Sequence, residues 1–190
     1  HRPICLLPIL GRILDRMIHA RLLPEILKLT ISSTLHGFLP GKSCDTANME
    51  RLSFLDQCRS EGLACYVLSL DIKGAFNFID PSLLDEATNI LPKYLKSMLV
   101  SYYTGRTIAN REIHGATPQG GVSSPDILNM CMAVVSSELQ TRLAFLRSFI
   151  NSYADDYIIC IACPPHDLQY WAQFATETAV ETFEKWGFEI

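Results

Sequence analysis

Two adjacent aspartates, Asp155 and Asp156, interrupt the otherwise apolar stretch SFINSYADDYIICIA at residues 148–162. Short apolar runs of this kind are typical of buried β-strands, and a polar pair between them is typical of a tight turn. The stretch therefore predicts strand, turn and strand, with two like charges at the tip of a hairpin. Burying unpaired carboxylates is costly, so the tip calls for a compensating positive charge.

A third carboxylate ends a second apolar run, ACYVLSLD, at residues 64–71. If this strand joins the same sheet, Asp71, Asp155 and Asp156 converge at one edge. Hard cations such as Mg²⁺ prefer oxygen ligands, and two such ions can promote a phosphoryl displacement. The alternative interpretation is that the Asp-Asp pair is simply favourable hairpin-turn chemistry.

The remaining elements are expected to be mostly helical. The order of elements predicts an α+β fold with one central antiparallel sheet packed by helices. A loop at 36–47 leads into a helix capped by Ser43 or Asp45, and Pro24 is expected to kink or restart the first helix. The expected segments are helices over 8–28, 83–103 and 166–186, a hairpin over 106–114, and a long helix with Pro125 near its start.

Composition narrows the class of protein. A chain of 190 residues that is 48% apolar can bury a sizeable core,. The run YIICIAC at 157–163 is far shorter than the roughly 20 residues of a membrane span, so no membrane association is expected. Seven cysteines in apolar stretches predict reduced thiols, and the CxxC spacing of Cys160 and Cys163 is interpreted as core packing,.

Charge is unevenly distributed along the chain. Residues 1–59 carry eight Lys or Arg against five Asp or Glu, whereas residues 115–190 carry three against nine. This pattern is compatible with a phosphate-binding lobe beside a metal-binding one, and equally with ordinary solvated faces. No Gly-rich dinucleotide or P-loop fingerprint is present.

Five motifs in one order resemble those of reverse transcriptases. LSLDIKGAFNFID, GATPQGGVSSPDILN and SYADDYIICI are similar to the three palm motifs of that family, and RPICLLPILGRILDRMIHARL and HGFLPGKSCDTA resemble its finger motifs. Their form is nearest to the enzymes of non-LTR (LINE-type) retrotransposons. The closing ETFEKWGFEI resembles the start of the next palm motif.

The resemblance implies a right-hand polymerase with fingers at 1–63 and a palm with inserted finger elements at 64–190, without the thumb. We interpret the chain as a fragment of a larger polyprotein that also contains a thumb and an endonuclease domain. The implied activity is RNA-directed DNA polymerisation, which we expect to be weak or absent in this fragment alone. The implied location is intracellular, in nucleus and cytoplasm as a ribonucleoprotein.

The resemblance also assigns the metal site. Asp71, Asp155 and Asp156, the aspartates of the first palm motif and of the Tyr153-Ala154-Asp-Asp box, would hold two Mg²⁺ ions, with Mn²⁺ as a possible substitute. The backbone carbonyl of Ile72 would be a further ligand. The expected partners are an RNA template, a DNA primer and dNTPs.

The nucleotide pocket follows from the same motifs. Lys73, Gly74 and Ala75 would present backbone N–H groups to the triphosphate, and Phe76 would crowd the sugar 2′ carbon. Gln119 and Gly120 would lie against the incoming nucleotide. Lys42, and less directly His36 or Arg51, would meet phosphates. The chain departs from the family at Asn77 and Leu39, where Asp and Arg are frequent.

Other functions remain open from the sequence. A group II intron maturase or a telomerase-like enzyme would use the same chemistry. A catalytically silent nucleic-acid-binding descendant would keep the fold without the reaction. An unrelated Mg²⁺ phosphohydrolase is disfavoured, because no His lies close in sequence to Asp71 or Asp155,.

Overall fold

The structure, a computed structural model, describes residues 6–29, 34–76, 79–103, 106–108, 111–113, 117 and 120–190. The chain forms two compact units. The first contains His1–Ser32 and Gly74–Val134, and the second contains Ser33–Lys73 and Val135–Ile190. Compactness does not test which residues act as fingers and which as palm, so the division at residues 63 and 64 stays a prediction.

The second unit is built on a three-stranded antiparallel sheet. Strands β1 (Ala64–Asp71), β4 (Arg147–Tyr153) and β5 (Asp156–Cys163) lie in the order β1-β5-β4. The central strand β5 is buried along nearly its whole length, as its run of Ile and Cys residues predicts,. The expected α+β class, the strand at 64–71 and the hairpin around Asp155 are confirmed.

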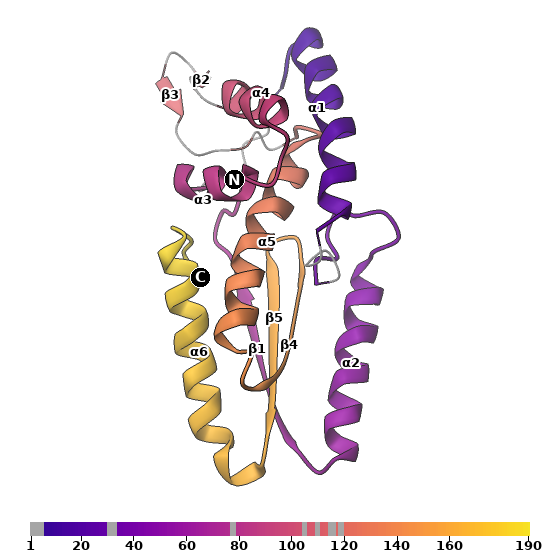
Figure 1. The fold of residues 1–190 in the computed structure, drawn as a ribbon, viewed down its shortest axis with the longest axis vertical. Coiled ribbons are helices and arrows are strands. Elements are labelled where there is room, and N and C mark those ends of the chain that lie inside the picture. The colour runs from indigo at the N-terminus through magenta and orange to yellow at the C-terminus, as the bar shows by residue number, and fades with distance from the viewer. Residues whose placement is uncertain are drawn as a thin grey trace. The chain divides into compact units, whose positions relative to one another are not determined.

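Helices cover both faces of this sheet (Figure 1). On one face, Tyr157 of β5 packs edge-on against Phe183 of α6 (Leu168–Lys185), with ring centroids 5.1 Å apart. On the other, Phe149 of β4 stacks on Phe54 of α2 (Cys44–Ser60) at 5.5 Å. Side chains alternate between the faces of a strand, so the CxxC sulfurs of β5 lie on opposite faces and form no paired site,.

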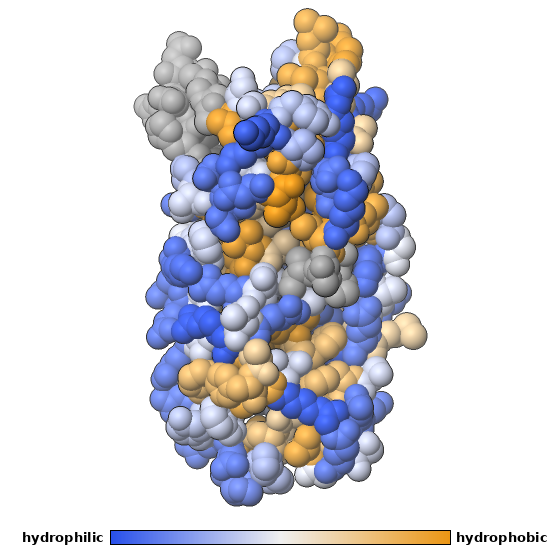
Figure 2. All heavy atoms as spheres, viewed as in Figure 1, coloured by the Kyte–Doolittle hydropathy of each residue, from blue (hydrophilic) through white to orange (hydrophobic). Residues whose placement is uncertain are grey.

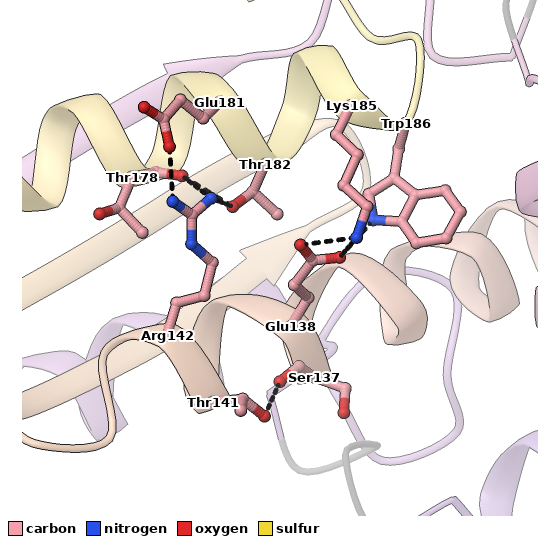
Figure 3. A network of polar contacts seen from close by, with 9 residues as sticks. All are labelled: Ser137, Glu138, Thr141, Arg142, Thr178, Glu181, Thr182, Lys185 and Trp186. Carbon is pink, nitrogen blue, oxygen red and sulfur yellow. Dashed lines mark hydrogen bonds and ion pairs between the residues drawn. The ribbon is translucent and has the colours of Figure 1, made fainter.

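Two kinds of contact hold helix α6 in place: a buried face and a network of polar side chains. Its buried positions recur at intervals of three and four residues, as an amphipathic helix requires: Ala175, Thr178, Ala179, Thr182 and Phe183,. Figure 3 shows Arg142 bonding Thr182 (2.9 Å) and Glu181 (2.5 Å), while Glu138 accepts from Lys185 (2.8 Å). The 3-10 turn η2 (Pro165–Asp167) precedes the helix.

Helix α2 begins at a well-formed cap. The Ser43 hydroxyl accepts from the Thr46 N–H (3.1 Å), and the Thr46 hydroxyl accepts from the Ser43 N–H (2.8 Å). This reciprocal pair satisfies two N–H groups at the helix start. Of the two predicted caps, Ser43 is therefore confirmed.

The first unit is mainly helical. It contains α1 (Ile9–Leu27), α3 (Pro81–Thr88), α4 (Lys93–Tyr103), the short hairpin of β2 (Arg106–Ile108) and β3 (Arg111–Ile113), and the start of α5 (Ser124–Arg142), which continues into the second unit. The predicted hairpin is confirmed, and its turn at 109–110 lies outside the described residues.

One helix prediction needs correction. The single helix expected over 83–103 is two helices, because Pro92 disfavours helical backbone at Leu91,. Helix α4 begins directly after Pro92, whose carbonyl accepts from the Leu95 N–H (2.9 Å). Helix α1 continues through Pro24 to Leu27, so it does not restart there, and the kink expected as the alternative stays a prediction.

Helix α1 leaves an apolar face uncovered within the described residues. Ile9, Leu10 and Ile13, and Leu6 just before the helix, are each more than half exposed, and Figure 2 shows apolar residues gathered where Figure 1 draws α1. None of the described helices combines the length and apolar character needed to cross a membrane.

Candidate active site

The hairpin of β4 and β5 turns at two residues, Ala154 and Asp155. Tyr153 pairs with Asp156 across the turn. Ala154 has a φ of 57°, at the position where two-residue hairpins usually carry glycine. A left-handed alanine costs roughly 1 kcal/mol or more, so the tip of this hairpin holds a strained residue directly before the first aspartate.

Asp71 pairs with Asp156 across β1 and β5. The N–H of Ile72, the residue after Asp71, donates to the carbonyl of Asp155, the residue before Asp156 (3.2 Å). This pattern marks a non-hydrogen-bonded pair, in which the Cα atoms are about 4.5 Å apart and the side chains are closest. The three aspartates thus lie at one end of the sheet, as expected, and their catalytic role stays a prediction.

This acidic end is open to solvent. Asp71 and Asp156 are exposed and Asp155 is half-buried, whereas the next residue, Tyr157, is fully buried. The expectation of buried carboxylates is therefore wrong: the strands are buried, and the charges lie beyond their end. Hydration of the exposed carboxylates removes most of the desolvation cost, but it leaves the repulsion between facing like charges.

The donor set fits a hard divalent cation. Carboxylate oxygens are the ligands that Mg²⁺ prefers. Among the described residues no three His, Cys, Asp or Glu side chains come close enough together to hold an ion. Asp71, Asp155 and Asp156 therefore share one end of the sheet without closing on a common centre. Their mutual repulsion opposes such closure until a cation neutralises it.

Tyr157 anchors the hairpin beneath the acidic end. Its hydroxyl lies 2.5 Å from the Ser136 hydroxyl, in a buried contact between β5 and α5. Burial raises the pKa of Tyr157 to about 12. The residue after Asp156 is thus a neutral, firmly packed side chain, and this limits how far the acidic end can move.

In the loop that was predicted to meet phosphates, one residue is part of the buried structure instead. His36 is fully buried, with Nδ1 2.9 Å from the Thr46 hydroxyl and Nε2 3.1 Å from the Glu50 carboxylate. Its suggested phosphate contact is therefore wrong. Lys42 pairs with the same Glu50 at 3.2 Å and is partly exposed, so its predicted phosphate contact would require exchange of this partner.

Lys73 is engaged by the C-terminal segment. Its N–H donates to the Glu189 carbonyl (2.9 Å), and its ammonium group pairs with the Glu189 carboxylate. The resemblance assigns this N–H to the triphosphate. In the structure the group has a protein partner, so nucleotide binding at Lys73 would displace Glu189.

The other predicted pocket residues belong to the first unit. Gly74 has a φ of 59° and Gly120 a φ of 102°, conformations that suit glycine,. Ala75 is buried. The Phe76 carbonyl accepts from the N–H and the hydroxyl of Thr117, at 2.8 and 3.1 Å. Gln119 and Asn77 lie outside the described residues.

Sequence reasoning missed Asp15. This buried carboxylate accepts from the Val122 N–H (2.5 Å), the Ser123 N–H (3.3 Å) and the Ser123 hydroxyl. It thereby fixes the residues that follow Gly120. The signal was available, because Asp15 stands on the buried stripe of α1 with Ile18, Leu22 and Ile26,.

The comparisons of this chain with known proteins agree on one protein family. Residues 1–190 match the family described as reverse transcriptase (RNA-dependent DNA polymerase). The chain is 31% identical over 176 residues to the Pol polyprotein of type-1 retrotransposable element R1 from Bradysia coprophila, covering 85% of this chain and 16% of that protein. It is 28% identical over 212 residues to the RNA-directed DNA polymerase from mobile element jockey of Drosophila funebris, covering 100% and 22%.

A solved structure shares the fold. Telomerase from Candida albicans, in complex with a fragment of telomeric RNA, matches with a TM-score of 0.63 at 10% identity, covering 94% of this chain and 34% of that one. At this identity the match bears on the fold alone. The chain spans less than a quarter of the length of the two curated relatives.

Proposed function

Because the chain belongs to the reverse transcriptase (RNA-dependent DNA polymerase) family, we propose that it catalyses RNA-directed DNA synthesis. The substrates would be a primer 3′-hydroxyl and dNTPs, on an RNA template. One observation carries the proposal: Asp71 faces Asp156 in a narrow pair beside Asp155, at the solvent-exposed end of a buried sheet.

The carboxylates would hold two Mg²⁺ ions, for which Mn²⁺ can substitute, with the Ile72 carbonyl as a further ligand. When bound, such ions would supply activation of the attacking hydroxyl and neutralisation of the charge on the phosphates. The chain's own contribution is positioning. The register of β1 and β5 holds Asp71 opposite Asp156, and the packing of Tyr157 keeps that register in place.

The nucleotide would contact residues of the first two palm motifs and of the finger loop. Gly74 and Ala75 would offer backbone N–H groups to the triphosphate, as small residues allow. Phe76 would exclude a ribose 2′-hydroxyl. Gln119 and Gly120 would lie against the incoming nucleotide. Lys73 and Lys42 would join phosphates by leaving Glu189 and Glu50.

The relatives are named for a retrotransposable element, R1, and a mobile element, jockey. We therefore assign this chain a role in retrotransposition, within an intracellular ribonucleoprotein and together with thumb and endonuclease domains. A maturase-type role would differ in its RNA template and in its priming, which makes template preference the distinguishing measurement.

One observation favours a second candidate, a catalytically silent nucleic-acid-binding module. Both the backbone and the side chain of Lys73 are engaged by Glu189, as expected if no triphosphate ever binds there. This module would bind primed RNA without incorporating nucleotide.

The test is dNTP incorporation on a primed RNA template with Mg²⁺, using the longest polypeptide that the reading frame encodes and residues 1–190 beside it. Asp155→Ala should abolish incorporation, while Asp56→Ala, which removes an exposed carboxylate of α2, should not. Folded protein that binds primed RNA but incorporates nothing would favour the silent module.

A further inference from the structure

We propose that Gly37 is a positioning residue for the aspartates, since a side chain there would displace the turn that carries them. The proposal rests on the proposed function, because it assigns Gly37 a part in the same reaction. Gly37 lies in the loop HGFLPGK, more than a hundred residues before the turn.

The loop is joined to the edge of the sheet by its backbone. Leu35 forms a parallel bridge with Ser152 of β4. The Ser152 N–H donates to the Thr34 carbonyl, and the His36 N–H donates to the Ser152 carbonyl, both at 2.9 Å. Residues 34–36 therefore extend the sheet beyond β4, two residues from the turn.

The next loop residue meets the turn itself. A Cβ atom built on Gly37 would lie 2.4 Å from the backbone nitrogen of Ala154 and 3.0 Å from its Cα. The first distance is well below any normal contact, and the obstacle is backbone, which cannot rotate away. Gly37 does not have the left-handed φ of Gly41 or Gly62, so close approach, and not conformation, requires glycine here.

The loop is anchored more firmly than the turn. Leu35 and His36 are buried, and the His36 ring is held by Thr46 and Glu50 of α2. Ala154, by contrast, is already strained at a φ of 57°. A side chain at position 37 would therefore move Ala154, and with it Asp155.

Displacement of Asp155 should affect chemistry more than substrate binding. Metal-assisted phosphoryl transfer depends on positioning, and a shift of about 1 Å can cost up to about a hundredfold in rate. We expect Gly37→Ala to lower kcat between about tenfold and a hundredfold. The Mg²⁺ concentration for half-maximal rate should rise, while KM for dNTP stays within twofold, as roughly expected for lost positioning alone.

Two further substitutions isolate the cause. Gly62→Ala is a control for strain placed away from the turn, because Gly62 of the same unit has a φ of 74°, which disfavours alanine, while a Cβ there meets nothing within 4 Å. It should leave kcat and the Mg²⁺ dependence unchanged. Ala154→Gly relieves the left-handed strain and frees the turn to shift, so the double variant Gly37→Ala, Ala154→Gly should recover part of kcat.

Kinetics in the longest encoded polypeptide decide the proposal. Unchanged kcat and Mg²⁺ dependence in folded Gly37→Ala would overturn it. If Gly37→Ala does not fold, recovery of folding in the double variant supports the contact with Ala154, and failure to recover overturns it.

Amide hydrogen exchange separates this proposal from the proposed function. If the wild type itself incorporates no nucleotide, the catalytic proposal fails. Exchange at residues 154–156 still tests the contact. Faster exchange there in Gly37→Ala than in Gly62→Ala supports positioning of the turn by Gly37, and equal exchange in both variants overturns it.

Discussion

Asp71 and Asp156 face each other across β1 and β5 at a non-hydrogen-bonded position, where antiparallel strands bring side chains closest,. Like charges placed directly opposite each other destabilise a sheet. A chain selected only for stability would replace either aspartate by a neutral residue, and among the described residues no cationic side chain pairs with either carboxylate to offset the repulsion. This conflict between fold and charge is the physical reason for assigning a cation to the site.

The contact between Lys73 and Glu189 leads to a prediction about nucleotide affinity. Glu189→Gln removes the charge that competes with phosphate for the Lys73 ammonium. We expect KM for dNTP to fall, with the free energy of unfolding changed by less than about 1 kcal/mol because the pair is exposed. Steady-state kinetics on primed RNA measure this, with Glu177→Gln on α6 as the control. A higher KM would show that Glu189 supports the pocket.

Phe76 leads to a prediction about sugar selection. If its ring excludes the 2′-hydroxyl, Phe76→Ala should raise the ratio of ribonucleotide to deoxyribonucleotide incorporation by at least tenfold, roughly the discrimination that one steric contact supplies. Competition between labelled ATP and dATP measures the ratio. A ratio that does not change, with dATP incorporation intact, would assign Phe76 to packing.

Asp15 leads to a prediction about stability. Asp15→Ala leaves the Val122 and Ser123 donors without their buried acceptor, which should cost about 3 kcal/mol of unfolding free energy. Asp15→Asn keeps one acceptor oxygen and should cost less. Urea denaturation measures both, with Asp56→Ala as an exposed control. Equal stability of Asp15→Ala and wild type would contradict this role of Asp15 as a buried acceptor.

Asp126 leads to a prediction about pH. Burial raises its pKa from 3.8 to about 6, against the opposing effect of His19, whose Nδ1 lies 2.6 Å from the carboxylate. Since the folded state holds a proton that the unfolded state releases, this group stabilises the fold below pH 3.8, and that contribution is lost as the pH rises through about 6. Thermal unfolding between these pH values should show wild type losing stability relative to Asp126→Asn. Parallel curves would contradict the shift.

Local pattern predicted the elements that carry the site. The strand over Ala64–Asp71 and the hairpin at Asp155 follow from apolar runs that end at polar residues, and Ser43 follows from its capping chemistry. Contacts between distant segments were not predictable in this way. The pairing of Leu35 with Ser152 and the engagement of Lys73 by Glu189 join residues more than a hundred positions apart. Neither pairing leaves a periodic signal in either partner.

The most direct test of the account is the effect of Mg²⁺ on thermal stability in wild type and in Asp156→Asn. Asparagine keeps the shape of the side chain and removes the charge. We predict that without Mg²⁺ the variant is more stable, by up to about 1 kcal/mol for one facing pair. We also predict that Mg²⁺ raises the Tm of wild type but not of the variant. If Mg²⁺ raises both Tm values equally, or if the variant is less stable without it, the facing carboxylates are not a cation site.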